Sequence, residues 1–224
     1  MIKKISEVLS VIKKDFSVEV RMLHVNKKGT VSGYYNDYSC LESDIKQYDG
    51  KNDIYITLNS ILPTIIARSK NHLTSYAKNT TTDKEIIRRK WILIDLDPER
   101  PAGISSTDEE LEYAHKMAEE IKDYLEKEGF TEPVYAMSGN GYHLLYSTDL
   151  LNSSEVTNLV KSFLCTLDKR FSNERVKVDT STYNPARIVK LYGTVACKGD
   201  DTEDRPHRLS LIHISCLLEH LQTH

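Results

Sequence analysis

The sequence predicts an α+β fold, for three reasons. Segments of helical periodicity and segments of strand periodicity are interspersed along the 224 residues. Several predicted strands follow one another as hairpins instead of alternating strictly with helices. The composition, 39% hydrophobic and 28% charged, is typical of a globular protein with a buried core. A chain of this length forms one large domain or two small ones.

The first half of the chain contains a predicted helix and two predicted strands. Apolar residues at helical spacing predict an amphipathic helix over 5–12. Strands are predicted over 19–25 and 53–59, and the second (DIYITLN) alternates strongly. Residues 26–40, rich in Gly, Ser, Asn and Tyr, predict a loop or a hairpin, whereas residues 60–81 have no pattern that assigns them.

The second half contains further helices and strands. Thr81 or Thr82 is predicted to cap a short helix through Arg89, which leads into a strand over 90–96. In chain order the other predicted elements are a helix from the Thr107–Glu110 capping box to Gly129, a strand–turn–strand unit over 132–147, a helix over 153–172, strands near 175–179, 187–192 and 207–214, and a short segment over 216–221.

Composition argues against a membrane protein and against a cysteine-based framework. No apolar run approaches the roughly 18 residues that a membrane span needs, and no signal-peptide core follows the basic start, so we expect a cytoplasmic protein. Cys40, Cys165, Cys197 and Cys216 are far apart and include no CxxC pair, which predicts free thiols and no cysteine zinc site. A net charge of −3 argues against a wholly electrostatic nucleic-acid binder, although local basic patches matter more.

The run WILIDLDPERPAG, residues 91–103, joins a strongly apolar strand to two aspartates. Because strand residues alternate faces, Trp91, Leu93, Asp95 and Asp97 share one face, and the two carboxylates lie side by side. Like charges at that separation require a compensating cation, a shifted pKa or abundant water. Of these three, a divalent metal ion would also give the pair a catalytic use. We therefore take a metal site as the hypothesis and test it against the other motifs.

An Asp-x-Asp pair occurs in three classes of phosphate-handling enzyme. A haloacid-dehalogenase phosphatase wants a Gly and then Thr or Val shortly after its nucleophile, where Pro98 and Glu99 stand here. A nucleotide-sugar glycosyltransferase holds a metal–diphosphate with such a pair, and composition does not exclude this class. A nucleotidyl transferase uses the pair for two metal ions about 3.5–4 Å apart.

The sequence SGNGYH, residues 138–143, stands between VYAM and LLYS. Its Asn-Gly pair strongly favours a β-hairpin turn. A turn with two glycines can also lay backbone N–H groups against phosphate oxygens, with Ser138 and His143 as side-chain donors at its ends. Both interpretations can hold together.

The third motif is VKVD, residues 176–179, followed by basic residues. Asp179 ends a predicted strand much as Asp97 does. Arg187 and Lys190 lie in the next predicted strand, and their spacing makes them face opposite sides unless the backbone bulges. A second basic group, residues 88–90 (RRK), precedes the aspartate strand and is, on charge alone, typical of a solvated surface.

The order of these motifs resembles that of a known family. The archaeo-eukaryotic primase (primase-polymerase) superfamily has a catalytic domain with DxD or DxE, a Ser-to-His motif and a late hydrophobic-Asp. The flanking segments WILIDLDPERPAGISSTDEE and YNPARIVKLYGTVACKGDDTEDRPHR resemble the branch found in phage, plasmid and CRISPR-associated primase-polymerases. The resemblance covers roughly residues 50–214 and includes no zinc-binding cluster.

The resemblance implies an RNA-recognition-like mixed sheet joined to a second α/β unit, with the active site in the cleft between them. It implies one catalytic domain over 1–224, with an N-terminal unit over 1–80 and a motif-bearing unit over 81–215, and leaves open that the domain is part of a longer protein. The implied activity is metal-dependent nucleotidyl transfer that makes and extends primers on single-stranded DNA from nucleoside triphosphates. The implied catalytic residues, which would hold two Mg²⁺ or Mn²⁺ ions, are Asp95, Asp97 and Asp179.

The resemblance also assigns nucleotide and template contacts. The residues expected at the triphosphate are Ser138, Gly139, Asn140, Gly141, His143 and one of Arg187 and Lys190, of which Lys190 is favoured. The residues expected at the template are Arg88, Arg89 and Lys198. A monomer is expected, and neither the sugar of the nucleotide nor the biological pathway is predicted.

Two other interpretations stay open at this point. One is a non-catalytic module that binds single-stranded nucleic acid on a degraded primase fold, and three intact aspartates argue against it. The other is a different metal-dependent phosphate-handling enzyme, and the SGNGYH segment argues against that class.

Overall fold

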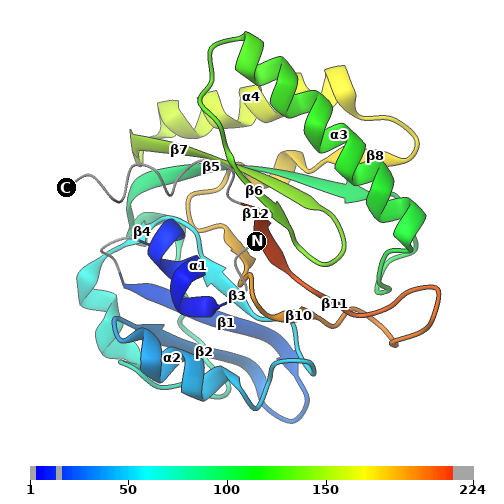
Figure 1. The fold of residues 1–224 in the computed structure, drawn as a ribbon. Coiled ribbons are helices and arrows are strands. Elements are labelled where there is room, and N and C mark those ends of the chain that lie inside the picture. The colour runs from blue at the N-terminus through cyan, green and yellow to red at the C-terminus, as the bar shows by residue number, and fades with distance from the viewer. Residues whose placement is uncertain (1–3, 14–16, 214–224) are drawn as a thin grey trace.

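The fold consists of two larger β-sheets with helices against them and one two-stranded pair, β10 and β11 (Figure 1), in a computed structural model that describes residues 4–13 and 17–213. The helices are α1 Ile5–Ile12, α2 Tyr38–Ile45, α3 Asp108–Lys127 and α4 Ser154–Phe171, with 3₁₀ turns η1 Pro63–Arg68, η2 Asp83–Glu85 and η3 Thr180–Tyr183. The strands are β1 Val18–Val25, β2 Gly29–Tyr35, β3 Tyr55–Thr57, β4 Ser60–Ile61, β5 Ile86–Pro98, β6 Val134–Met137, β7 Tyr142–Leu151, β8 Val176–Val178, β9 Ile188–Lys190, β10 Val195–Ala196, β11 Arg208–Leu209 and β12 Leu211–His213.

The smaller sheet has the strand order β2-β1-β3-β9, and its neighbouring strands are antiparallel. Helices α1 and α2 pack against one of its faces (Figure 1), where Leu9 and Leu41 join Val20 and Ile56 in a buried cluster. Its fourth strand, β9, comes from the second half of the sequence. The predicted division at residue 80 stays a prediction, and β9 links the two sides of that boundary through hydrogen bonds to β3.

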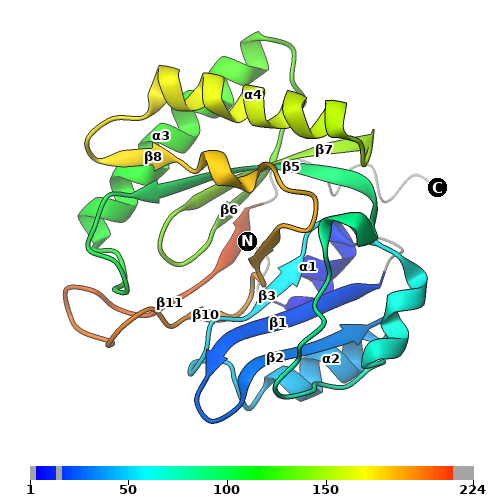
Figure 2. The ribbon, with the colours of Figure 1, turned by 180° about the vertical axis from the view of Figure 1, so that it is seen from behind.

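The larger sheet has the order β12-β6-β7-β5-β4, and β8 pairs with the C-terminal part of β5. Helices α3 and α4 cover one face, as the front and back views both show (Figures 1 and 2). Ile94 and Leu96 of β5 pack beneath these helices, whereas Leu93 belongs to the cluster shared with the smaller sheet. The alternation predicted for the aspartate strand is therefore confirmed, and so is the α+β class; the RNA-recognition-like description stays a prediction.

Local structure differs from the predictions in the first half of the chain. The helix predicted to end at Arg89 is wrong, because only the turn η2 forms before β5 begins at Ile86. The β-branched Ile86 and Ile87 favour a strand, and Ile86 pairs with Ile61 of β4. Residues 26–40 contain a hairpin turn, β2 and the start of α2, and the segment predicted over 216–221 lies outside the described residues.

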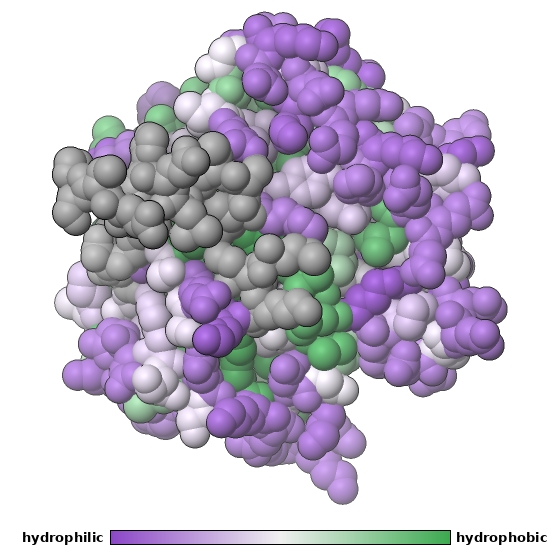
Figure 3. Space-filling model, in the orientation of Figure 1, coloured by the Kyte–Doolittle hydropathy of each residue, from purple (hydrophilic) through white to green (hydrophobic). Residues whose placement is uncertain are grey.

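The outer surface on the face seen in Figure 3 is mostly hydrophilic, and hydrophobic atoms show only in small areas. None of the helices in the described part of the chain is both long and apolar enough to span a bilayer. The three cysteines among the described residues are free thiols, as predicted: Cys40, Cys165 and Cys197.

Lys13, directly after α1, is a buried cation with a side chain turned into the protein. The residue is 2% exposed, and its ammonium donates to the carbonyl oxygens of Leu58 (3.2 Å) and Asn59 (2.8 Å). Burial lowers the pKa of Lys13 from 10.5 to about 7. Between these two values the unfolded chain binds more protons than the folded one, so this group makes stability rise with pH across that window. Below about pH 7, Lys13 is protonated in both the folded and the unfolded chain, and the cost of burying its charge lowers the free energy of unfolding by its full amount.

The Lys13→Met variant is expected to lose this pH dependence. The free energy of unfolding of the parent protein should rise relative to that of the variant by on the order of 1 kcal/mol per pH unit between pH 7 and 9. Urea unfolding at pH 7, 8 and 9 measures it. Lys4→Met is the matched control, because Lys4 is exposed and makes only a surface ion pair with Glu7. Parallel pH profiles for all three proteins would contradict the assignment.

Candidate active site

Three aspartates converge where β5 and β8 pair. Asp95 and Asp97 lie in the C-terminal part of β5, and Asp179 follows β8 directly. The backbone N–H of Asp179 donates to the carbonyl oxygen of Asp95 at 2.8 Å, which continues the ladder between the two strands. All three aspartates line one cavity of about 470 Å³. The structure thus brings together the acidic residues that the two separate sequence motifs predicted.

The cavity carries charges of both signs. Its acidic lining residues are Asp95, Asp97, Glu99 and Asp179, and its basic ones are Arg100, Lys177 and Lys198. Near-balance of charge allows several carboxylates to share a small volume, because the nearby positive charges offset the mutual repulsion of the carboxylates.

Asp95 is held by a histidine on the neighbouring strand. Asp95 and His143 are directly opposite in the β5–β7 ladder, and Nε2 of His143 lies 3.3 Å from Oδ1 of Asp95. Nδ1 of His143 lies 2.6 Å from the Tyr192 hydroxyl, and burial raises the pKa of Tyr192 well above its ordinary value. A protonated Tyr192 can donate to Nδ1, which leaves the ring proton on Nε2, facing Asp95.

The pKa of Asp95 lies below its ordinary value despite burial. Burial alone raises this pKa, but the electrostatic effect of His143, its hydrogen bond to Asp95 and the positive charges of Arg187 and Lys198 together outweigh it. Asp95 therefore remains ionised at neutral pH, as a metal ligand must be.

Asp97 is paired with Arg100, a cation that the sequence analysis did not single out. Nη1 of Arg100 lies 2.8 Å from Oδ1 of Asp97, and the Arg100 side chain is only 4% exposed whereas that of Asp97 is 53% exposed. Arg100 also donates to the carbonyl oxygens of Pro98 (2.9 Å) and Ile104 (3.1 Å). Partial loss of hydration inside the cavity and the charge of Asp95 raise the pKa of Asp97, against the opposing effects of Arg100 and Lys198.

Asp179 caps the turn η3 that follows it. Its Oδ1 accepts the N–H of Ser181 at 2.7 Å. The guanidinium of Arg187 donates to the carbonyl and, at 3.1 Å, to the hydroxyl of the same Ser181. Arg187 is thus placed beside the carboxylates, and its charge lowers the pKa of Asp95.

The donor set suits a hard divalent cation, because several carboxylate oxygens line one cavity and no thiolate is among them. Within residues 4–13 and 17–213, no group of three or more His, Cys, Asp or Glu side chains lies close enough to hold a metal ion as arranged. Each of the three aspartates instead faces an internal partner: His143, Arg100 or the Ser181 backbone. Side-chain cations therefore compensate the like charges of the Asp-x-Asp pair here.

The Gly-rich turn closes on itself. The Ser138 hydroxyl donates to the Gly141 carbonyl at 3.1 Å and accepts the Gly141 N–H at 3.2 Å. The Gly139 N–H points to the sulfur of Met137, and Asn140 is hydrogen-bonded to Ser106. These bonds establish a packing role as a hairpin turn, and the phosphate contact assigned to residues 138–141 stays a prediction.

Two predicted binding residues are buried in internal contacts. Lys190 is 4% exposed, and its ammonium donates to Asp53 (3.1 Å) and to the Val195 carbonyl (2.8 Å). Arg187 and Lys190 face different partners, as their spacing predicted, and Arg187 is the one beside the carboxylates. The phosphate contact of either residue stays a prediction. Arg89 is 2% exposed and donates to the Tyr183 carbonyl and the Thr157 hydroxyl, so its side chain is not presented to a template.

The two other residues predicted at the template have different surroundings. Arg88 is half-buried and paired with Asp149 at 2.7 Å. Lys198 lines the cavity with the aspartates, which makes it a residue of the candidate site itself. Lys198 lies far from the motifs in sequence, so only the packing of its loop places it in the cavity. Arg100 lies three residues after Asp97 and could have been noticed in the sequence as a candidate counter-charge.

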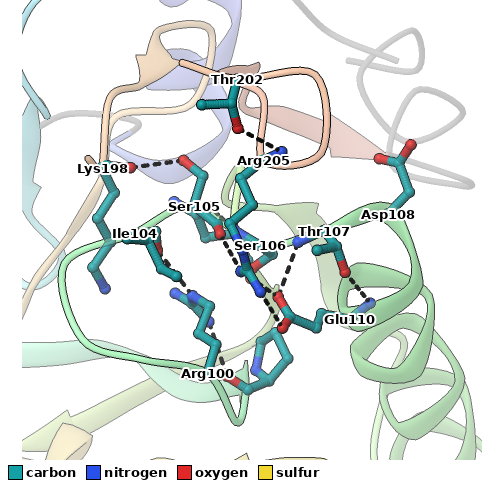
Figure 4. Close-up of polar contacts among 12 residues, drawn as sticks. Arg100, Ile104, Ser105, Ser106, Thr107, Asp108, Glu110, Lys198, Thr202 and Arg205 are labelled. Atoms are coloured by element: carbon teal, nitrogen blue, oxygen red, sulfur yellow. Dashed lines mark hydrogen bonds and ion pairs between the residues drawn. The ribbon is translucent and has the colours of Figure 1, made fainter. Parts of the chain in front are cut away.

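A short segment, residues 104–106, connects the parts of the site (Figure 4). Ser105 and Ser106 are at most 1% exposed. The Ser105 hydroxyl donates to the Lys198 carbonyl at 2.9 Å, and the Ser106 hydroxyl donates to the Asn140 carbonyl at 2.5 Å. The Ile104 carbonyl accepts from Arg100. One short segment thereby sets the positions of Lys198, the Gly-rich turn and Arg100 relative to one another.

Arg205 locks the loop after β10 onto this segment. Its guanidinium donates to the Ser105 carbonyl at 2.7 Å and to both carboxylate oxygens of Glu110, at 2.8 and 2.9 Å (Figure 4). Such a forked contact fixes geometry as well as charge. Glu110 also accepts the Thr107 N–H in the capping box of α3, so the loop is anchored to the start of a helix.

Arg205→Met is expected to loosen this loop locally. Amide hydrogen exchange of residues 198–204 should become faster by about tenfold or more, because the loop loses its side-chain anchor while the sheets stay packed. Arg68→Met is the matched control: Arg68 makes a similar forked pair with Glu85, near the opposite end of β5. Unchanged exchange in 198–204, or equal acceleration in both variants, would contradict the anchoring role.

Comparisons with known proteins bear on the fold. No family model matches the chain, and no curated protein sequence matches it. Among solved structures, primase RepB′ has a TM-score of 0.51 at 12% identity, over 94% of this chain and 55% of that chain. The AEP domain of the cyanophage S-2L primase-polymerase has a TM-score of 0.49 at 12% identity, over 94% of this chain and 88% of that chain. The polymerase domain of Mycobacterium tuberculosis ligase D, in complex with DNA, has a TM-score of 0.45 at 13% identity, over 91% and 78%.

The similarity to RepB′ shows the fold. RepB′ is a primase, and a primase fold is what the motifs predicted, so the resemblance is confirmed at the level of the fold. The present chain spans about 55% of the length of RepB′.

Proposed function

We propose that this chain, which has the primase-polymerase fold, is a metal-dependent nucleotidyl transferase that makes and extends primers on single-stranded DNA. The observation that carries the proposal is the convergence of Asp95, Asp97 and Asp179 with the cations Arg100 and Lys198 on one cavity. Phosphoryl transfer needs charge neutralisation and positioning more than a covalent relay, and this cavity supplies both. The proposed substrates are deoxy- or ribonucleoside triphosphates. We also propose that the protein acts in the cytoplasm.

The aspartates would hold the divalent ions. Two Mg²⁺ or Mn²⁺ ions held by Asp95, Asp97 and Asp179 would activate the primer 3′-hydroxyl and neutralise the leaving pyrophosphate. His143 holds Asp95 in place through its 3.3 Å contact, so its first role is to orient a ligand. Its direct contact with phosphate stays a prediction.

The cations near the aspartates are suited to the triphosphate. Lys198 lines the cavity, and Arg187 lies against Ser181, next to Asp179. Lys198 is a flexible point charge and Arg187 a planar fork, and both bind phosphate oxygens well. These two residues replace Lys190 as the proposed phosphate contacts. Arg88 would have to leave Asp149 to contact a template strand.

Primer synthesis on unprimed single-stranded DNA tests the proposal. The assay supplies labelled deoxy- or ribonucleotides with Mn²⁺ or Mg²⁺, and a second reaction supplies a primer for extension. Template-dependent products that need the metal ion support the proposal, and the sugar of the product identifies the substrate. If neither synthesis nor extension occurs, the catalytic proposal fails; metal-independent binding of single-stranded DNA would then favour the binding module.

A further inference from the structure

Arg100 has the features of a built-in counter-ion. Its side chain is 4% exposed although it lines an open cavity, and three different acceptors hold its guanidinium: Asp97, Pro98 and Ile104. Surface arginines that merely meet a carboxylate are rarely held at so many points. The Ile104 carbonyl belongs to the segment that Ser105 and Ser106 pin in place, so the position of Arg100 is set by the fold.

The contact of Arg100 with Asp97 competes with metal binding. A guanidinium 2.8 Å from Oδ1 occupies a lone-pair direction of that oxygen and places a positive charge beside the carboxylate that would bind a divalent cation. Asp95 is likewise paired, with His143 at 3.3 Å. The cavity therefore offers a bare divalent ion less attraction than its number of carboxylates suggests.

We propose that Arg100 acts as an internal cation that weakens the binding of divalent ions to Asp97 until a nucleoside triphosphate enters. The inference rests on the proposed function. A triphosphate would give Arg100 a second anion within reach, so that Arg100 can share or leave Asp97 while the ion is held by both Asp97 and the phosphates. Metal binding and nucleotide binding are then mutually reinforcing, as linkage requires. Arg100 is a positioning residue in this account and takes no part in bond making.

Titration of Mn²⁺ into the nucleotide-free protein, followed by the electron paramagnetic resonance signal of the free ion, tests the first half. Arg100→Gln should bind Mn²⁺ about tenfold more tightly than the parent protein, because one competing charge in contact with the ligand is gone. Lys177→Gln is the matched control, since Lys177 lines the same cavity from an exposed position and should change the affinity by less than about threefold. Equal or weaker Mn²⁺ binding by Arg100→Gln, or equal tightening in both variants, would overturn the inference.

Arg100→Lys separates charge from loop geometry. It keeps the charge but not the fork, so its Mn²⁺ affinity should stay within about threefold of that of the parent protein. A tightening as large as that of Arg100→Gln would assign the effect to loop rearrangement and overturn the inference. If a thermal melt shows that Arg100→Gln does not fold, Arg100→Met, which also removes the charge, replaces it in the titration with the same expected and contradicting results.

Calorimetry with a non-hydrolysable nucleoside triphosphate at saturating Mn²⁺ tests the second half. The parent protein should bind the analogue at least about threefold more tightly than Arg100→Gln, because Arg100 is free to contact the phosphates. Equal affinities would overturn the coupling. If the parent protein binds no triphosphate at all, the proposed function fails, whereas the Mn²⁺ titration still decides the role of Arg100.

Discussion

Asp97→Asn is expected to lower the rate of nucleotide incorporation by about a thousandfold or more while leaving the fold intact. The amide oxygen can still accept the hydrogen bond of Arg100, so the loop that begins at Pro98 keeps its anchor. The negative charge is lost, and with it much of the attraction for the divalent ions on which the proposed reaction depends. A thousandfold loss corresponds to about 4 kcal/mol of transition-state stabilisation.

Primer extension at saturating nucleotide and metal measures this effect, with circular dichroism and a thermal melt to confirm folding. Glu99→Gln is the matched control, because Glu99 also lines the cavity and loses the same charge two positions further along. Glu99 is exposed and has no proposed role as a ligand, so its variant should retain activity within about threefold. Comparable losses in both variants would mean that the cavity acts only through its overall charge, and full activity of Asp97→Asn would refute the proposed metal site.

Gly141→Ala is expected to have the largest effect on the fold of the site. A Cβ at this position would lie 2.3 Å from the Leu96 carbonyl oxygen and 3.5 Å from Cα of Asp97. The next residue, Tyr142, pairs with Leu96 in the β5–β7 ladder, so the backbone cannot move away without parting the strands beside the aspartates. We expect a loss of about 2–4 kcal/mol in the free energy of unfolding and a loss of activity with it.

Urea unfolding at neutral pH measures the stability of this variant. Gly50→Ala is the control, because Gly50 has φ +76° and a Cβ added there would have no neighbouring atom within 4 Å. It therefore reports the cost of a left-handed backbone without a clash, about 1 kcal/mol. If Gly141→Ala is no more destabilising than Gly50→Ala, the close approach of the turn to β5 is not a constraint on the site.

Periodicity predicted the elements whose order is local. The helix from the Thr107–Glu110 capping box, the helix over 153–172 and the hairpin around SGNG all form as expected, because caps, stripes and turns depend on residues within one or two turns of the chain. The helix predicted before residue 90 did not form. There the pairing of β5 with β4 and β7 outweighs a capping signal that supports only one 3₁₀ turn.

The acidic part of the site could also be predicted, since alternation along β5 and the end of VKVD each bring an aspartate to a strand end. Apart from Arg100, which lies three residues after Asp97, the cations of the site could not be assigned from the sequence. From the sequence alone, Lys190 is expected to bind the nucleotide and Arg89 the template. In the structure each is a buried cation with a partner from a distant segment. Whether a basic residue is buried against internal partners or faces a ligand depends on how the surrounding elements pack.

What the sequence alone determined about this protein is its α+β class, most of its helices and strands, and three aspartates placed at strand ends. The tertiary structure decided which partners meet those aspartates: the guanidinium of Arg100 on Asp97, the imidazole of His143 on Asp95, and Lys198 brought in by the loop that Arg205 and Ser105 hold. The physical reason is range. Strand alternation and helix capping act between neighbours in the chain, whereas a charge pair inside a cavity depends on where segments a hundred residues apart come to rest.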